Sequence, residues 1–316
     1  MKRQIFKTIM FLGIPFTWLS SIWLLFVKKV GASKYEDDIF MKVGILPVID
    51  HYYQPMINPK KHLTKSLRDV RELPGIDFNA KEQLEVLSQF NYHEELLKFP
   101  LNKTMETEYY YNNLSYGPGD AEYLYNIIRF YKPQKIIEIG SGLSTMMVKN
   151  ARDQNKIENN EYTCRHICIE PYEMPWLENF DVELLREKVE NVDKSVFQQL
   201  EANDILFIDS SHVIRPQGDV LFEYQEILPL LKKGVLIHIH DIFSPQDYPD
   251  KWIYDHKLWN EQYLLEAFLT FNHDFKIIGA LNYLALYHQK ELSGKCPVYG
   301  QPEIKNSIGA FWMVRV

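Results

Sequence analysis

Short apolar runs alternate with longer amphipathic stretches from Lys135 to the end of the chain. Four runs, K-I-I-E-I-G, R-H-I-C-I-E, D-I-L-F-I-D and G-V-L-I-H-I-H-D, each pass directly into a loop. This alternation is typical of βαβ units and a mostly parallel sheet. Two later runs, F-K-I-I-G-A-L and I-G-A-F-W-M-V-R-V, predict antiparallel strands at one edge of the sheet. Both runs come after a long predicted helix over 259–271. The pattern predicts an α/β fold, and two strands that end the chain after a long helix suit a seven-stranded sheet.

The N-terminal segment has a different pattern, because no charged residue occurs from Thr8 to Val27. A hydrocarbon core is crossed by about 20 apolar residues, so this stretch predicts a membrane helix. Lysines and an arginine flank it and no small-residue cleavage site stands out, which favours an anchor over a cleaved signal peptide. The alternative is a helix that lies on the surface, since Gly13 and Pro15 would kink a spanning helix.

Residues 31–106 contain short amphipathic pieces broken by prolines, with no alternation long enough to begin a sheet. They predict a helical lead-in, whose clearest helix covers 79–97 after an N-cap at Asp77 or Asn79. We therefore expect a membrane-associating segment at 1–30, the lead-in at 31–106 and the main domain at 107–316.

The composition of the chain argues against some classes of protein, such as nucleic-acid-binding and disulfide-rich proteins. The 316 residues are 46% hydrophobic, enough for a sizeable core, and the net charge of −7 gives no electrostatic reason to bind nucleic acid. The three cysteines are too few for a disulfide framework, and Cys164 and Cys168 fall in an expected buried strand. A structural reading of these thiols is favoured over a metal or redox one.

A glycine-rich turn follows the first strand, in E-I-G-S-G-L-S-T at 138–145, and leads into a helix. Glycines there allow a tight turn and close approach of the backbone to a ligand at the helix N-terminus. Thr145 stands where a dinucleotide fingerprint would have a third glycine, which argues against a nicotinamide oxidoreductase. The second strand ends in Glu170, at the spacing that places an acid on a ribose diol.

Acids and imidazoles follow the fourth and fifth runs. Asp209 and His212 follow one strand, while His240 and Asp241 follow the next, so a parallel sheet brings both pairs to one edge. His238 lies deeper in its apolar strand and is expected to be structural. The four residues predicted to be catalytic are Asp209, His212, His240 and Asp241.

These motifs, with C-I-E-P-Y-E, D-I-L-F-I-D-S-S-H-V and G-V-L-I-H-I-H-D-I-F, resemble a class I S-adenosylmethionine-dependent methyltransferase of the bacterial methyltransferase-24-like group. The resemblance implies a Rossmann-like fold and S-adenosyl-L-methionine as cosubstrate. It implies that the glycine loop holds the methionine end, Glu170 the ribose and Asn191, by position only, the adenine edge. The cofactor-binding residues it implies are Glu138, Gly140, Ser141, Gly142, Glu170 and Asn191.

Asp209 and Asp241 occupy strand ends comparable to metal-binding acids of catechol-like and macrolide-sugar O-methyltransferases, which implies a divalent cation such as magnesium or manganese. Ile242 stands where the catechol type has an amide ligand, so His212, His240 or Asp219 would complete the shell. The alternative is metal-free, with His212 or His240 as general base. Both versions stay open at this point.

The resulting hypothesis is an O-methyltransferase for a small-molecule or glycan acceptor with a hydroxyl group, held at the membrane by its N-terminal segment. Because the cosubstrate is cytosolic, the catalytic domain is expected on the cytoplasmic side. The competing hypothesis is a membrane-tethered S-adenosylmethionine-binding or assembly protein without turnover. The polar set at the two strand ends favours catalysis, since an inert domain has no need to desolvate such groups together.

Overall fold

A computed structural model describes residues 2–172, 174–302, 304 and 307–316. Met1 and Glu173, the last residue of the C-I-E-P-Y-E motif, lie outside the described residues. The chain divides into two compact units, Met1–Lys65 and Ser66–Val316. The lead-in therefore continues into the second unit, and the boundaries expected at 30 and 106 stay predictions.

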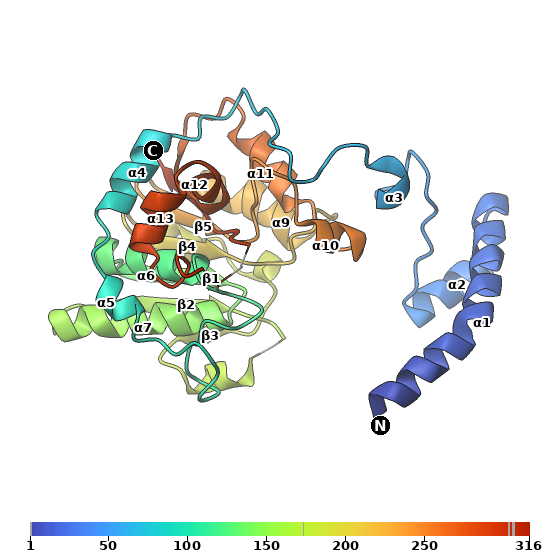
Figure 1. Cartoon of the computed structure of the whole chain (residues 1–316), viewed down its shortest axis with the longest axis horizontal. Helices are drawn as coiled ribbons and strands as arrows, with labels where there is room; N and C mark the ends of the chain where they lie inside the picture. Colours follow the sequence, from blue (N-terminus) through green and yellow to red (C-terminus); the bar gives the residue numbers. More distant parts are fainter. Residues whose placement is uncertain (1, 173, 303, 305–306) are drawn as a thin grey trace. The chain divides into compact units, whose positions relative to one another are not determined.

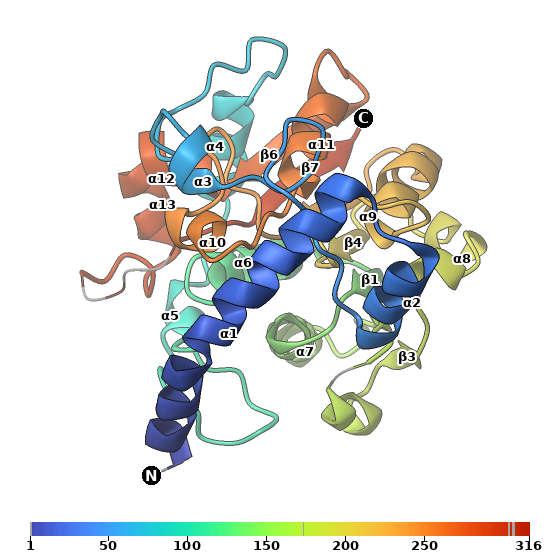
Figure 2. The same cartoon turned by 90° about the vertical axis from the view of Figure 1, so that its right-hand side faces the viewer.

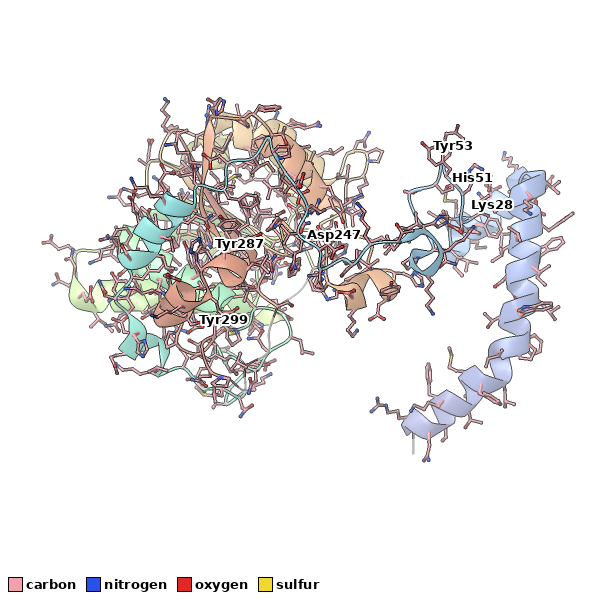
Figure 3. All side chains as sticks on the ribbon, turned by 45° about the horizontal axis from the view of Figure 1, so that its top comes forward. Lys28, His51, Tyr53, Asp247, Tyr287 and Tyr299 are labelled. Carbon is pink, nitrogen blue, oxygen red and sulfur yellow. The ribbon has the colours of Figure 1, made fainter. Side chains whose placement is uncertain are left out.

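The first unit consists of helices α1 (Lys2–Val30), α2 (Lys34–Val43) and α3 (Pro59–His62). Within α1, the segment Arg3–Val30 is long and apolar enough to cross a membrane. Its most apolar stretch of 18 residues has a mean hydropathy of 1.8, and none of that stretch is buried. The side chains of α1 project outward from the helix in Figure 3, which also labels the exposed His51 and Tyr53 of this unit. A single helix of this kind is also compatible with a signal sequence.

The second unit is built on one seven-stranded sheet in the order β3-β2-β1-β4-β5-β7-β6. Figure 1 labels β1 to β5, and Figure 2 labels β6 and β7. β1 to β5 all run in one direction, and β7 runs antiparallel to both of its neighbours, β5 and β6. This confirms the mostly parallel sheet and one of the two antiparallel strands. The edge strand β6 runs in the same direction as β5, because β7 lies between them. The strands are β1 (Lys135–Ile139), β2 (Arg165–Ile169), β3 (Glu183–Leu185), β4 (Ile205–Ile208), β5 (Leu236–Ile239), β6 (Phe275–Ala280) and β7 (Phe311–Arg315).

Helices cover both faces of the sheet, and each face has its own apolar core. The first core joins the sheet to α4 (Ala80–Ser88), α6 (Asp120–Tyr131), α7 (Leu143–Glu158), α12 (Leu281–Tyr287) and α13 (Gln289–Lys295). The second joins it to α8 (Ser195–Gln198), α9 (Asp219–Phe222) and α11 (Glu261–Leu269), as Figures 1 and 2 show from two sides. This explains why β4 and β5 are apolar almost throughout: a strand that is covered on both faces has no solvent-facing side for polar residues to occupy.

The helix expected over 79–97 is two helices, α4 and α5 (His93–Leu96). Between them Phe90 enters the core, 1% exposed and edge-on to Tyr123, while the amide of Asn91 donates to the Gln89 carbonyl. Burial of Phe90 and this local hydrogen bond end the first helix, an effect that apolar spacing alone does not reveal.

Two arginines fasten the lead-in to the segments that follow β5. Arg71 Nη1 donates to Glu266 Oε2 at 2.7 Å, and its Nε lies 3.3 Å from Asp247, which Figure 3 labels. Arg68 Nη2 donates to the backbone carbonyls of Asp247 and Tyr248. The residues from Ser66 onward are therefore an integral part of the second unit.

Candidate active site

Three strands place the first residues of the site side by side at the carboxyl edge of the sheet. Gly140, Asp209 and His240 each follow a strand directly and continue its ladder by one hydrogen bond. Asp209 N donates to Ile139 O at 2.9 Å, and His240 N donates to Ile208 O at 2.9 Å. The sheet register therefore fixes the spacing of the glycine turn, the acid and the imidazole.

The turn after β1 requires glycine at one position. Gly140 has φ +77°, and a Cβ there would lie 1.9 Å from the carbonyl oxygen of Asp209. Gly142 differs, because its Cβ would meet only Met174 Cε at 3.9 Å. Gly140 is thus needed by the fold, whereas the space beside Gly142 is open.

A cavity of about 290 Å³ opens between the glycine turn and the ends of β2 and β4. The Glu170 carboxylate is held at this cavity by the backbone N–H groups of Ser141, at 3.3 Å, and Tyr172, at 2.9 Å. The residues that line the cavity are Ile139, Gly140, Ile169, Glu170, Pro171, Tyr172, Lys188, Val189, Glu190, Asp209, Ser210, Ser211, Arg215 and Asp219.

Gly140 and Glu170 line this cavity, whereas the other four expected cofactor residues, Glu138, Ser141, Gly142 and Asn191, are not among its lining residues. Glu138 is fully buried beneath the turn, where it accepts from Ser144 Oγ at 2.6 Å and pairs with His166 Nε2 at 2.8 Å. Asn191 is exposed at the end of a short 3-10 helix (Val189–Asn191) and lines an adjoining hollow. Val189 and Glu190 of the same helix face the cavity instead, so the positional match is displaced by one or two residues.

The four predicted catalytic residues come together. His212 Nε2 lies 3.1 Å from Asp209 Oδ1 and 3.6 Å from Asp241 Oδ2. His240 Nδ1 lies 3.4 Å from the same Asp209 oxygen and 3.8 Å from the same Asp241 oxygen. Asp209 and Asp241 thus stand between two buried imidazoles while keeping part of their own surface exposed.

Each imidazole is oriented by a further carboxylate. His212 Nδ1 pairs with the fully buried Glu261 at 2.7 Å, and His240 Nε2 lies 3.5 Å from Asp120. Glu261 was not found from the sequence, because it opens α11 far along the chain from His212 and no local motif links them. Asp120 is the first residue of α6, and no local sequence motif links it to His240 either.

Backbone geometry at the site is also unusual. His212 and Asp241 have φ values of 60° and 57°, a left-handed conformation that only a few per cent of residues other than glycine adopt, with asparagine, aspartate and histidine the most frequent among them. The turn at Asp241 brings its carboxylate back to His240, the residue before it. This reversal depends on a backbone conformation that the residue pattern does not specify.

The charges of the cluster shift its pKa values strongly. Burial opposes ionisation of Asp209, but the charge of His240 and a hydrogen bond from His212 hold the Asp209 pKa well below its usual range. Burial likewise opposes protonation of His212, yet hydrogen bonds to Asp209 and Glu261 raise its pKa to about 10. Asp241 and Asp209 raise the pKa of His240 against burial, and burial raises the pKa of Asp241 itself. The cluster therefore favours a compensating positive charge.

The remaining candidates are not part of the cluster of Asp209, His212, His240 and Asp241. Asp219 is bound by the backbone N–H and hydroxyl of Ser211, at 2.9 and 2.7 Å, and stabilises the loop after β4. His238 is fully buried between Phe207 and Trp312, and burial lowers its pKa well below the usual value. Ile242 is buried and apolar. Among the histidines after β4 and β5, only His212 and His240 reach the two aspartates.

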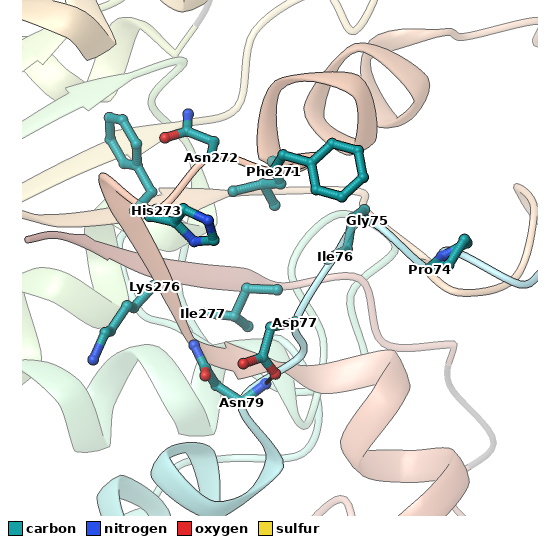
Figure 4. Close-up of a pocket in the computed structure, with 12 residues that line it drawn as sticks. Pro74, Gly75, Ile76, Asp77, Asn79, Phe271, Asn272, His273, Lys276 and Ile277 are labelled. Atoms are coloured by element: carbon teal, nitrogen blue, oxygen red, sulfur yellow. Dashed lines mark hydrogen bonds between the residues drawn. The ribbon is translucent and has the colours of Figure 1, made fainter.

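A separate hollow of about 330 Å³ lies beside the start of β6 (Figure 4). Segments 74–79 and 269–277 line it, with Asp77, Asn79 and Lys276 among the labelled side chains. Because β6 runs parallel to β5, its start belongs to the amino edge of the sheet. This hollow is therefore remote from the acid and histidine cluster.

The chain is similar to several known proteins. The family model Methyltransf_24, "Methyltransferase domain", matches residues 137–242, which span the glycine turn and the ends of β2, β4 and β5. An uncharacterized protein of Archaeoglobus fulgidus is 31% identical over 181 residues, covering 54% of this chain and 80% of that protein. The crystal structure of "a putative methyltransferase" from Thermobifida fusca YX is similar at 13% identity and a TM-score of 0.37, covering 78% of this chain and 99% of that one. With its sheet order and the family match over the site, the chain belongs to the class I methyltransferase family.

Proposed function

We propose that the protein transfers a methyl group from S-adenosyl-L-methionine to a hydroxyl oxygen of its acceptor, a small molecule such as a sugar or a surface glycan. One observation carries the proposal. Asp209 lines the cavity of the glycine turn and also contacts both imidazoles of the acid and histidine cluster. A methyl donor bound in the cavity would therefore lie next to groups that can position an acceptor.

In this proposal Gly140, Ser141 and Gly142 hold the methionine end of the cosubstrate, and Glu170 accepts the ribose hydroxyls. Two backbone N–H groups already orient the Glu170 carboxylate, which supports that role. Glu138 would act from beneath, by fixing Ser144 at the start of α7. The short helix containing Asn191 would border the adenine.

Transfer from a sulfonium needs alignment of donor and acceptor and removal of the acceptor proton. A divalent cation at Asp209 and Asp241 would bind the acceptor oxygen and lower the pKa of its proton. In the metal-free version His212 or His240 would take that proton directly. With no cation bound, the carboxylates around both imidazoles favour their protonated forms, which have no lone pair for this task. A cation at the carboxylates would take the place of this positive charge, so that the imidazoles need not be protonated. We therefore prefer the cation version.

We further propose that α1 anchors the protein in a membrane, with residues 31–106 as lead-in and 107–316 as the catalytic domain. The long uncharged helix supports the anchor. A cytoplasmic catalytic domain would have direct access to the cosubstrate.

The test is to incubate the purified full chain with methyl-labelled S-adenosylmethionine and a membrane-glycan extract, and to identify the labelled product. We expect an alkali-stable methyl ether on a hydroxyl oxygen. Asp209→Asn should reduce labelling at least a hundredfold, while Asp255→Asn, in an exposed ion pair with Lys251, should leave it unchanged. Label on nitrogen or carbon, or equal labelling by Asp209→Asn, would overturn the proposal.

A further inference from the structure

His240 has a buried ring nitrogen that no hydrogen bond satisfies. The residue is 4% exposed, and Nδ1 has no hydrogen-bond partner although it faces Asp209 at 3.4 Å and Asp241 at 3.8 Å. Buried polar atoms in proteins are nearly always paired, so such a nitrogen needs an explanation. The two groups that it faces, the Asp209 and Asp241 carboxylates, can both bind a cation.

The three donor atoms have the spacing of metal ligands. One carboxylate oxygen each from Asp209 and Asp241 and one nitrogen of His240 all lie within 4.8 Å of one another. Ligands bonded to one ion at about 2.1 Å are separated by roughly 3.0 to 3.4 Å in octahedral or tetrahedral arrangements. The 3.4 and 3.8 Å separations therefore need only a small contraction around an ion.

Asp120 orients the imidazole from the other side. It accepts from Gly309 N and Ala310 N, so its carboxylate is fixed on the backbone leading into β7, and it faces His240 Nε2 at 3.5 Å. A histidine that ligates a metal usually has its other ring nitrogen on a carboxylate or carbonyl, which fixes the tautomer and strengthens the ligand. The pair of Asp120 and His240 has this arrangement.

We propose that Asp209, His240 and Asp241 form a mixed nitrogen and oxygen centre for a divalent transition metal (manganese, iron, cobalt or zinc) in preference to magnesium, with Asp120 as its positioning residue. This deepens the cation version of the proposed function and rests on it. Magnesium prefers oxygen ligands and water, whereas imidazole suits the transition metals. His212 stands outside the three ligands, held by Glu261, and would steady Asp209.

The test is metal binding by the purified full chain in detergent, stripped with a chelator. Cobalt(II) is titrated by calorimetry and visible absorption, and magnesium or zinc is then added as competitor. We expect one cobalt ion per chain with a ligand-field band, displaced by equimolar zinc but not by a hundredfold excess of magnesium. This competition uses the unaltered protein and so does not depend on the folding of a variant.

Two variants and a control locate the site. His240→Asn should lose at least tenfold in cobalt affinity and change the band, and Asp120→Asn should lose roughly ten- to a hundredfold. His273→Asn, an exposed histidine remote from the site, should change neither. S-adenosylmethionine affinity and circular dichroism check that each variant is folded.

Magnesium displacing cobalt as readily as zinc does, an unchanged band in His240→Asn, or no metal binding at all would each overturn the inference. None of these results would overturn methyl transfer itself, because the labelling experiment can be carried out with magnesium or with chelator present. The failure of this inference is therefore distinguishable from failure of the proposed function.

Discussion

At the residue scale, the two glycines of the turn after β1 have different roles: the fold requires Gly140, whereas Gly142 leaves space that a ligand could occupy. Both glycines of G-S-G were expected to matter for close approach to the cosubstrate. Only Gly140 has a left-handed φ and no space for a Cβ, while Gly142 faces open space. Residue type identified the turn, but the role of each glycine depends on backbone geometry.

We predict that Gly142→Ala leaves the midpoint of thermal unfolding unchanged, because the nearest side-chain atom to its new Cβ would be Met174 Cε at 3.9 Å. The same Cβ would enter the space proposed for the cosubstrate, so S-adenosylmethionine binding should weaken. Gly140→Ala should instead destabilise the fold by several kcal/mol, through the 1.9 Å clash with Asp209 O and the positive φ. Calorimetric scanning and titration of both variants measure the two effects. Equal loss of stability in both would contradict this distinction.

A second prediction concerns Glu122, a fully buried acid of α6. Burial raises its pKa from 4.5 to about 7, against hydrogen bonds from the backbone of Val298, Tyr299 and Gly119. The native state therefore binds a proton more tightly than the unfolded state, and stability falls as pH rises from 4.5 to 7, by on the order of 3 kcal/mol.

Denaturant unfolding of the full chain from pH 5 to 8 would measure this slope. Glu122→Gln cannot titrate and should flatten it, whatever its effect on absolute stability. Glu94→Gln, at an exposed acid of α5, is the matched control. A slope that persists in Glu122→Gln would assign the pH dependence to other groups.

At the element scale, the alternation of apolar runs and helices predicted β1, β2, β4, β5, β6 and β7. The strand ends carried the polar residues, and parallel strands bring their carboxyl ends to one edge, so the sequence alone was enough to group Asp209, His212, His240 and Asp241. The split of the 79–97 helix and the roles of Asp120 and Glu261 could not be predicted in this way. They depend on contacts between segments distant in the chain.

The lead-in also shows this dependence on distant contacts. Arg71 joins it to Glu266 of α11, and both side chains are largely buried. We predict that Arg71→Met lowers the free energy of unfolding by about 3 kcal/mol, because it leaves a buried carboxylate unpaired. Urea unfolding measures the change, and Arg71→Met combined with Glu266→Gln should recover part of it. No difference between the single and double variants would indicate that the pair is not coupled.

At the scale of the whole molecule, the chain combines a long apolar helix with a methyltransferase unit. We predict that the full chain sediments with membranes and resists extraction by high salt, because an uncharged helix of this length matches the hydrocarbon thickness. Removal of residues 1–30 should release it into the soluble fraction. Full-length protein that is soluble without detergent would show that α1 does not anchor it.

The most direct test of the account as a whole is a calorimetric titration of S-adenosylmethionine into the full chain and its Glu170→Gln variant. Glu170 lines the cavity and is fixed by two backbone N–H groups, so loss of its charge should remove a charge-assisted contact worth about 1.5 to 3 kcal/mol. We predict one binding site per chain, with affinity at least tenfold weaker in Glu170→Gln and unchanged in the exposed control Glu291→Gln. Absence of saturable binding, or equal affinity in wild type and Glu170→Gln, would contradict the account.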